Sequence, residues 1–329
     1  MEKKRSLWVW ARLFRLQFLP FQIIIFGSMA VPVVIGLRMQ LSPLLAAAAA
    51  LAVATHIFWF CYGTLQNDYW DQDIDRHNPF GQTVFTEGYF SQKEKNGIIR
   101  FFAVLAFLCE IPQFAYIYYT HPNAAVDMSA YAIFIMTGFV LATVYSMPPV
   151  WAKRRLFGAL YTLLLVYVTG FLRFCLLFGG WNFIVLNIVY IFGICAFLYL
   201  DHMITSLALK DIADVYADEK GGARTVPLVW GLRPALNLSM AVLIMTMGAG
   251  VLLVMAGWLQ WWFLITYAGV ICYYYLFREM SGWIDEVSRD RTHWDRVPIR
   301  RKFLAVGYIM NWGVWIPCFM IAFNSALLI

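Results

Sequence analysis

Two clusters of acidic residues in this chain share one spacing. The first is Asp68, Asp71 and Asp75 in NDYWDQDID, and the second is Asp211, Asp214 and Asp218 in DIADVYAD. In both clusters the aspartates stand at positions i, i+3 and i+7, so a helix would place each trio within about 60° on one face. Asp73 falls elsewhere on such a helix, and Asn67 adds an amide oxygen beside the first trio.

This pattern has a specific chemistry. Carboxylates that share a helix face repel one another unless positive charge lies among them. Hard oxygen ligands without His or Cys favour Mg²⁺ over zinc, and Mg²⁺ usually combines one or two carboxylates with water and substrate phosphate oxygens. We therefore predict that Asn67 and both aspartate trios hold Mg²⁺ against a diphosphate, with the ions offsetting the charge of the leaving group. The alternative, weak surface salt bridges with Lys93, Lys95 or Lys210, leaves the matched spacing unexplained.

The elements that carry these clusters are predicted to be membrane helices. Of the 329 residues 62% are hydrophobic and 13% charged, against roughly 25% charged in soluble domains. A helix needs about 20 apolar residues to cross the hydrocarbon core. Nine runs qualify, and they predict one all-α domain over residues 1–329 with nine transmembrane helices around a central cavity. The runs are 18–37, 43–65, 99–120, 128–147, 156–179, 182–204, 234–256, 261–277 and 303–327.

Basic residues predict the orientation of these helices. With nine spans, 23 of the 25 Lys and Arg residues fall before the first helix or in alternate loops on one side, and only Arg38 and Arg173 do not. Lys and Arg in short loops stay cytoplasmic. We expect the N-terminus and both aspartate clusters on the cytoplasmic side and the C-terminus on the opposite side.

Other function classes have little support. The six cysteines are scattered without paired spacing and are expected to be packing residues. Arg12 and Arg15 interrupt the apolar start, so a removable signal peptide is not expected. The net charge of +6 lies in the predicted cytoplasmic loops and suits an anionic leaflet or a polyanionic substrate, and no motif indicates nucleic-acid binding.

Three segments in order resemble the UbiA superfamily of intramembrane prenyltransferases. The first cluster matches the family motif N-D-x-x-D-x-x-x-D at Asn67 and its three aspartates, and the second is followed by Gly222, Arg224 and Thr225, as in the family. Between them, YSMPPVWAKRR at 145–155 is similar to the family's Y-S-x-P-P segment that ends in Lys. The resemblance spans most of the chain and implies the nine-helix fold and Mg²⁺-dependent chemistry on a prenyl diphosphate.

The resemblance also implies residue roles. Asp71, Asp75, Tyr145 and Lys153 would act in catalysis, with Tyr145 and Lys153 holding the diphosphate. Diphosphate and cofactor contacts are expected from Asn67, Lys153, Arg154, Lys210 and Arg224.

One loop departs from the family pattern. Where members usually have R-P-L/I-x-x-G, this chain has QTVFTEG, with Gln82 and Thr83 in place of Arg and Pro. Either Arg76, Lys93 or Lys95 substitutes for the arginine, or the diphosphate sits differently.

The lipid-soluble substrate is expected to enter from the bilayer, with its tail among the helices. Loss of diphosphate leaves an allylic cation, which aromatic faces stabilise by about 0.5 to 2 kcal/mol. Aromatic candidates surround the first cluster: Phe58, Trp59, Phe60, Tyr62, Tyr69 and Trp70. Arg173, inside a predicted span, is either functional or reaches the outer interface, and His56 is expected to make an inter-helix hydrogen bond.

Three functions remain open at this point. The leading one is transfer of an isoprenoid chain to an aromatic or other lipid-pathway acceptor. The second is a terpene cyclase on the same scaffold, which the altered QTVFTEG loop and the many aromatics favour. The third is a carrier or scaffold, but the aspartates lie at the predicted cytoplasmic rim, whereas transporters place charges at mid-membrane depth.

Overall fold

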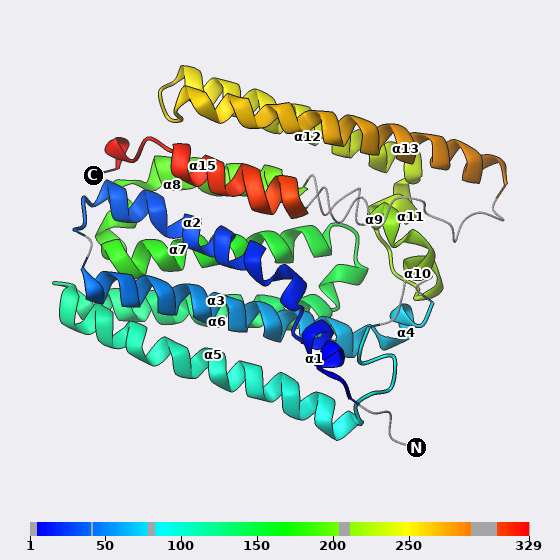
Figure 1. Ribbon diagram of the computed structural model, residues 1–329, viewed down its shortest axis with the longest axis horizontal. Helices are drawn as coiled ribbons and strands as arrows, with labels where there is room; N and C mark the ends of the chain where they lie inside the picture. The colour runs from blue at the N-terminus through cyan, green and yellow to red at the C-terminus, as the bar shows by residue number, and fades with distance from the viewer. Residues whose placement is uncertain (1–4, 41, 78–82, 204–210, 291–307, 329) are drawn as a thin grey trace.

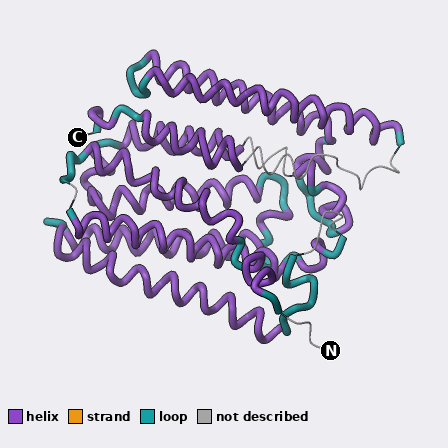
Figure 2. Tube along the Cα trace, in the orientation of Figure 1, coloured by secondary structure: helices purple, strands orange, loops and turns teal. Residues whose placement is uncertain are grey.

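The computed structural model describes residues 5–40, 42–77, 83–203, 211–290 and 308–328, and this part of the chain is helical without a named strand. Long helices lie roughly side by side, and short elements gather at one end of the bundle (Figures 1 and 2). The long helices are α2 (Leu19–Gly36), α3 (Pro43–Trp70), α5 (Gln92–Thr120), α6 (Ala124–Ser146), α7 (Gly158–Leu186), α8 (Ile188–Met203), α12 (Leu232–Met255) and α13 (Val270–Arg289).

The short elements lie between and beside these helices. They are α1 (Leu7–Leu13), η1 (Leu16–Phe18), α4 (Gln72–Asp75), η2 (Ala152–Arg154), α9 (Asp211–Ala213), α10 (Val215–Lys220), α11 (Val226–Trp230), η4 (Trp261–Gly269), η6 (Tyr308–Trp315), α15 (Ile316–Ala322) and η7 (Ser325–Leu327). In Figure 1, α1, α4 and α10 lie at one end of the bundle, and the last described residues lie at the other.

Local sequence explains where the long helices begin. Ser42 accepts a hydrogen bond from the Leu45 backbone N–H at 3.1 Å and caps α3. Ser91 and Glu94 form a reciprocal capping box at the start of α5. Each cap satisfies backbone donors that the first helical turn cannot satisfy itself.

Six described helical segments are long and apolar enough to span a membrane: Leu16–Gly36, Pro43–Trp70, Gln92–Thr120, Ala124–Ser146, Tyr167–Leu186 and Leu232–Met255. Ile188–Met203 and Ile309–Ala322 are shorter apolar helices, and the predicted run 261–277 coincides with η4 and the start of α13. The chain is therefore an all-helical, multi-pass membrane protein. The count of nine stays a prediction, because residues 303–307 of the last run lie outside the described part.

The predicted boundary between the fifth and sixth runs, between residues 179 and 182, coincides with a break in helical conformation. α7 is assigned as far as Leu186, but Gly180 within it is non-helical, with φ 72° and ψ −178°, and a second interruption falls at Asn187. The backbone N–H of Trp181, just after the kink, donates to Asp127 at 2.7 Å. A side chain from α6 thus supplies an acceptor where the helix is interrupted.

The interior contains three apolar clusters. The largest joins α2, α3, α6, α7, α8 and α15, and a second lies between α12, α13 and the segment after α9. The third packs α1 against α3, α5 and the loop that follows α4. This third cluster fixes the N-terminal segment against the first aspartate motif.

Candidate active site

The first aspartate motif lies where α3 ends. Asp71 separates α3 from α4 with φ −98° and ψ 7°, so the trio does not lie on one continuous helix as predicted. Helical hydrogen bonding still crosses the bend, because the Asp75 N–H donates to the Asp71 carbonyl at 2.8 Å. The bend redirects Asp75 relative to Asp68.

The second motif has the same local design. Asp214 separates α9 from α10 with φ −96° and ψ −1°, and the Asp218 N–H donates to the Asp214 carbonyl at 2.9 Å. Asp211 is buried at the start of α9. Each trio is therefore divided between two helical segments at its middle aspartate, although Asp214 stays in the right-handed helical region and hydrogen bonding continues past both residues.

The two motifs meet at one end of the bundle. α4 contacts α10, and a Cβ added to Gly221, just after α10, would lie 2.3 Å from Ile74 Cγ1. Only a residue without a side chain allows this approach. The charge of Asp214 contributes to the raised pKa of Asp75, which is consistent with the two carboxylates lying near one another.

Basic side chains lie among the carboxylates. Lys153 forms an ion pair with Asp71 and donates to Asn67 Oδ1 at 2.8 Å. Ser146 donates to the same amide oxygen at 3.2 Å. The Lys153 ammonium also lies 5.9 Å from the centre of the Tyr145 ring. The 145–155 segment thus supplies a cation directly to the first motif.

Arg154 links the two motifs. Its guanidinium lies 3.8 Å from Asp71 Oδ1 and stacks 3.8 Å from the Trp151 ring. Its carbonyl accepts from the Arg224 N–H at 2.9 Å. Burial lowers the pKa of Arg154, and the nearby charges of Asp73 and Asp218 oppose that shift. Anionic groups from both motifs therefore surround this guanidinium.

Asp75 carries the clearest electrostatic perturbation. Its pKa is raised to about 7, mainly by burial and also by the charges of Asp68 and Asp214, which outweigh the lowering effects of a hydrogen bond with Thr83 and the charge of Arg15. Its Oδ2 atom is buried without a hydrogen-bond partner among the described residues. A carboxylate in this situation is stabilised by a cation.

The donors fit Mg²⁺. Carboxylate and amide oxygens are the ligands this ion prefers, and Asp75 Oδ2 offers a buried oxygen without a hydrogen-bond partner. Within the described ranges, however, no three His, Cys, Asp or Glu side chains form a ready-made cluster. Asp68 and Asp71 pair instead with basic side chains, so an ion would have to be shared with substrate phosphate oxygens, as is usual for Mg²⁺.

The other predicted residues have different positions. Arg224 lies at the surface, and Lys210 lies outside the described residues. Arg76 is 4.0 Å from Asp73, both well exposed. Lys95 donates to Gln72 Oε1 at 2.5 Å, and Lys93 is exposed. None of the three residues considered as substitutes for the loop arginine has an ion pair with the first trio in the described structure.

Sequence reasoning missed Arg15. This residue follows α1 in the left-handed conformation, with φ 50°, and pairs with Asp68 at 2.5 Å. Arg12 anchors the same segment by two hydrogen bonds to Glu87, at 3.0 and 2.6 Å. Glu87 belongs to the QTVFTEG loop. The available signal was the pair of arginines just before the first span, which served to predict orientation and to argue against a signal peptide.

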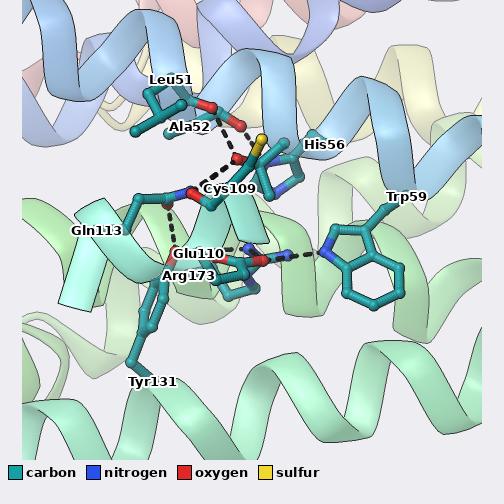
Figure 3. Close-up of polar contacts among 10 residues, drawn as sticks. Leu51, Ala52, His56, Trp59, Cys109, Glu110, Gln113, Tyr131 and Arg173 are labelled. Carbon is teal, nitrogen blue, oxygen red and sulfur yellow. Dashed lines mark hydrogen bonds and ion pairs between the residues drawn. The ribbon is translucent and has the colours of Figure 1, made fainter. Parts of the chain in front are cut away.

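A buried polar cluster lies among the helices away from the aspartates. Figure 3 shows Arg173 of α7 paired with Glu110 of α5, with Trp59 donating to Glu110 at 2.9 Å. Tyr131 also donates to Glu110 at 2.9 Å. Arg173 therefore makes a buried ion pair and does not extend to the outer interface.

His56 differs from its prediction as well. Its Nδ1 contacts the Ala52 carbonyl at 2.7 Å within α3, so this bond does not join two helices. The ring packs against Phe26 and Phe174, each 4.8 Å away between centroids. These contacts make His56 a packed residue of the core.

Comparison with known proteins identifies the family of this chain. Residues 23–294 match the UbiA prenyltransferase family, and the chain belongs to this family. A comparison with curated protein sequences finds no significant match.

Solved structures share the fold. A UbiA homolog from Archaeoglobus fulgidus bound to DMAPP and Mg²⁺ is 18% identical, with a TM-score of 0.53, and the match covers 94% of this chain and 98% of that one. The same figures for a GPP- and Mg²⁺-bound structure of a UbiA homolog from that organism are 17%, 0.53, 95% and 99%. A structure from work on digeranylgeranylglyceryl phosphate synthase gives 15%, 0.51, 97% and 98%. These likenesses establish a UbiA-like fold.

Proposed function

We propose that this protein is a Mg²⁺-dependent intramembrane prenyltransferase that moves an isoprenoid chain from a prenyl diphosphate to an aromatic or other lipid-pathway acceptor. The observation that carries the proposal is the contact of α4 with α10, which brings two matched aspartate motifs together around Lys153 and Arg154. Family membership and the solved relatives with bound prenyl diphosphate and Mg²⁺ support it.

In this proposal the oxygen-rich residues hold Mg²⁺. They are Asn67, Asp68, Asp71, Asp75, Asp211, Asp214 and Asp218. Bound Mg²⁺ would neutralise the charge that develops on the departing diphosphate. The chain itself brings Lys153 and Arg154 to the same place, and both can donate to phosphate oxygens. Tyr145, Lys210 and Arg224 are proposed as further diphosphate contacts.

Arg15 joins this set. It follows α1, whose Val9 and Leu13 belong to the third apolar cluster, and pairs with Asp68 from outside the two motifs. When a diphosphate binds, Arg15 can donate to the phosphate while Asp68 turns to the metal. The family's loop arginine has no counterpart at Gln82, so a guanidinium from the N-terminal segment supplies the missing positive charge.

The helices must then protect the allylic cation from water. The described aromatic residues above the first motif include Trp59, whose ring lies 5.8 Å from both Tyr62 and Phe139. Aromatic faces stabilise a cation without providing a nucleophile. A bound acceptor then attacks the cation carbon and loses a proton.

A terpene cyclase is the second candidate, because the loop departs from the family pattern at Gln82 and Thr83. In a cyclase, the substrate's own double bonds would attack the cation. One assay separates the two: purified protein receives farnesyl or geranylgeranyl diphosphate with and without a panel of acceptors. Pyrophosphate release with a prenylated product supports transfer, whereas release without acceptor and with a cyclic hydrocarbon supports cyclisation. Absence of release with every substrate and Mg²⁺ would refute both.

A further inference from the structure

An apolar groove lies between α1 and the start of α5, apart from the aspartate motifs. Its volume is about 380 Å³, and it is lined mainly by aromatic rings, among them Trp10, Phe14, Phe90, Phe101 and Phe102. Gly97 forms part of its wall, and a Cβ added there would meet nothing within 4 Å. The groove therefore has free space beside Gly97, and a hydrocarbon chain can occupy it.

The groove opens toward the bilayer. Phe101 is 60% exposed, and Val104, Leu108 and Ile111 continue the same exposed apolar face along α5. This helix is one of the candidate membrane spans, so these side chains face lipid. On α1, Leu7 and Trp8 are also largely exposed. Trp and Leu on a short amphipathic helix suit the membrane interface.

The charges at the groove favour an anionic headgroup. Arg5 stacks 4.6 Å from the Phe90 ring and lies at the edge of the groove. Lys93 and Arg100 are exposed and stand four residues before and three residues after Gly97, on the same side of α5. Glu94 also lines the groove, but Arg5 pairs with it at 2.7 Å and Ser91 donates to it. The charges of Arg5 and Glu94 thus offset one another at the groove, and Lys93 and Arg100 beside it leave an excess of positive charge.

We propose that this groove binds one anionic phospholipid from the surrounding leaflet. One acyl chain packs against the aromatic rings beside Gly97, and the phosphate contacts Arg5, Lys93 and Arg100. Neutral lipids would gain the apolar contacts but not the ionic ones. A basic side chain near an anionic membrane surface contributes about 1 kcal/mol, which corresponds to about fivefold in affinity for each contact.

Native mass spectrometry of the full-length purified protein can test the site, with phosphatidylglycerol and phosphatidylcholine titrated separately. Gly97→Phe fills the groove with a ring. Gly248→Phe is the matched control, because Gly248 also lies exposed on a long apolar helix with nothing near its Cβ. Arg5→Gln removes one ionic contact. Thermal unfolding of each variant establishes that it is folded before lipid binding is compared.

The wild-type protein is expected to retain one phosphatidylglycerol more than Gly97→Phe and the same number as Gly248→Phe. Arg5→Gln should weaken this binding about fivefold. Equal retention of phosphatidylcholine, or unchanged retention in folded Gly97→Phe, would overturn the proposal. Displacement of the lipid by farnesyl diphosphate at equal concentration would also overturn it, because the groove would then belong to the substrate path.

Discussion

Asp71 and Asp214 have nearly the same backbone conformation at equivalent places in the two motifs, with φ −98° and −96° and ψ 7° and −1°. Each interrupts a helix, and each carbonyl still accepts from the aspartate four residues later. The two motifs thus share a local geometry as well as a spacing, and both middle aspartates are placed at a bend. This relationship makes the pair the first target for substitution.

Asp71→Asn and Asp214→Asn should each lower kcat/KM by on the order of 10²- to 10³-fold, because each removes an anionic oxygen from the proposed metal and diphosphate site. Asp73→Asn is the matched control, since Asp73 lies in the same segment with its side chain 87% exposed. Steady-state pyrophosphate release measures the effect. Equal loss in all three variants would show that the segment tolerates no substitution and would remove the special role of the middle aspartates.

The pKa of Asp75 predicts a pH dependence. Burial raises this pKa to about 7 in the folded protein, so below pH 7 the carboxyl is protonated and competes poorly for a cation. The apparent Mg²⁺ affinity should therefore be about tenfold weaker at pH 6 than at pH 8. Mg²⁺ titration followed by thermal shift measures this. Asp75→Asn should bind Mg²⁺ more weakly at pH 8 and lose most of the pH dependence.

The same shift has a consequence for the metal-free protein. A carboxyl with a raised folded-state pKa opposes folding once the unfolded state ionises, so its unfavourable contribution is absent below the ordinary carboxyl pKa of about 4, grows between about pH 4 and pH 7, and is complete above pH 7. Without Mg²⁺, Asp75→Asn should therefore raise the thermal midpoint at pH 8 and change it little at about pH 4. A midpoint lowered by the substitution at pH 8 would contradict the electrostatic origin of the shift.

Arg15→Gln should raise the KM for the prenyl diphosphate about tenfold to 150-fold, since a hydrogen bond to a charged group contributes about 1.5 to 3 kcal/mol. Arg38→Gln is a close control, because Arg38 also has a left-handed backbone, with φ 51°, and is exposed. Arg15→Lys should recover part of the loss, because the positive charge returns without the guanidinium geometry. If both variants behave alike, Arg15 does not contact the diphosphate.

The sequence predicted the motifs, the helical membrane class and the family, because all three depend on short-range patterns. It could not predict the Arg15–Asp68 pair, whose residues lie 53 positions apart. Nor could it predict that Asp127, from another helix, supplies the acceptor for Trp181 beside the kink of α7 at Gly180. Hydropathy reports which segments are apolar, whereas such side-chain contacts depend on tertiary packing.

The bends at Asp71 and Asp214 were also beyond the sequence pattern. Spacing of i, i+3 and i+7 describes one helical face only if the helix is continuous, and both helices are interrupted at the middle aspartate. After the turns, α4 packs against α10 where Gly221 has no side chain to prevent the approach of Ile74. The sequence thus identified the residues of the two aspartate motifs, but it did not predict the interruption of the helix at Asp71 and Asp214.

Orientation can be tested by reporter fusions. The basic residues predict a cytoplasmic N-terminus and a C-terminus on the opposite side, and α1 and η7 lie at opposite ends of the bundle in Figure 1. A C-terminal alkaline phosphatase fusion should be active and a C-terminal green fluorescent protein fusion dark in a bacterial host. The opposite pattern would show that the number of spans is even.

The Glu110–Arg173 pair in Figure 3 should be a major determinant of stability, because both side chains are buried and their partner groups come from α3, α5, α6 and α7. Removing one partner of a buried pair leaves an uncompensated charge and costs about 3 to 5 kcal/mol. Glu110→Leu and Arg173→Met should each lower the thermal midpoint strongly, and the double variant should lose less than the sum of the two.

The Arg233–Asp285 pair provides the comparison, since its side chains are 38% and 60% exposed. Exposed pairs contribute about 0 to 1 kcal/mol, so Asp285→Asn should change the midpoint little. Thermal unfolding of the four proteins in one detergent gives the coupling between Glu110 and Arg173 directly. Additive losses in the double variant would mean that the two charges do not stabilise one another, and the cluster would then owe its stability to the hydrogen bonds of Trp59 and Tyr131.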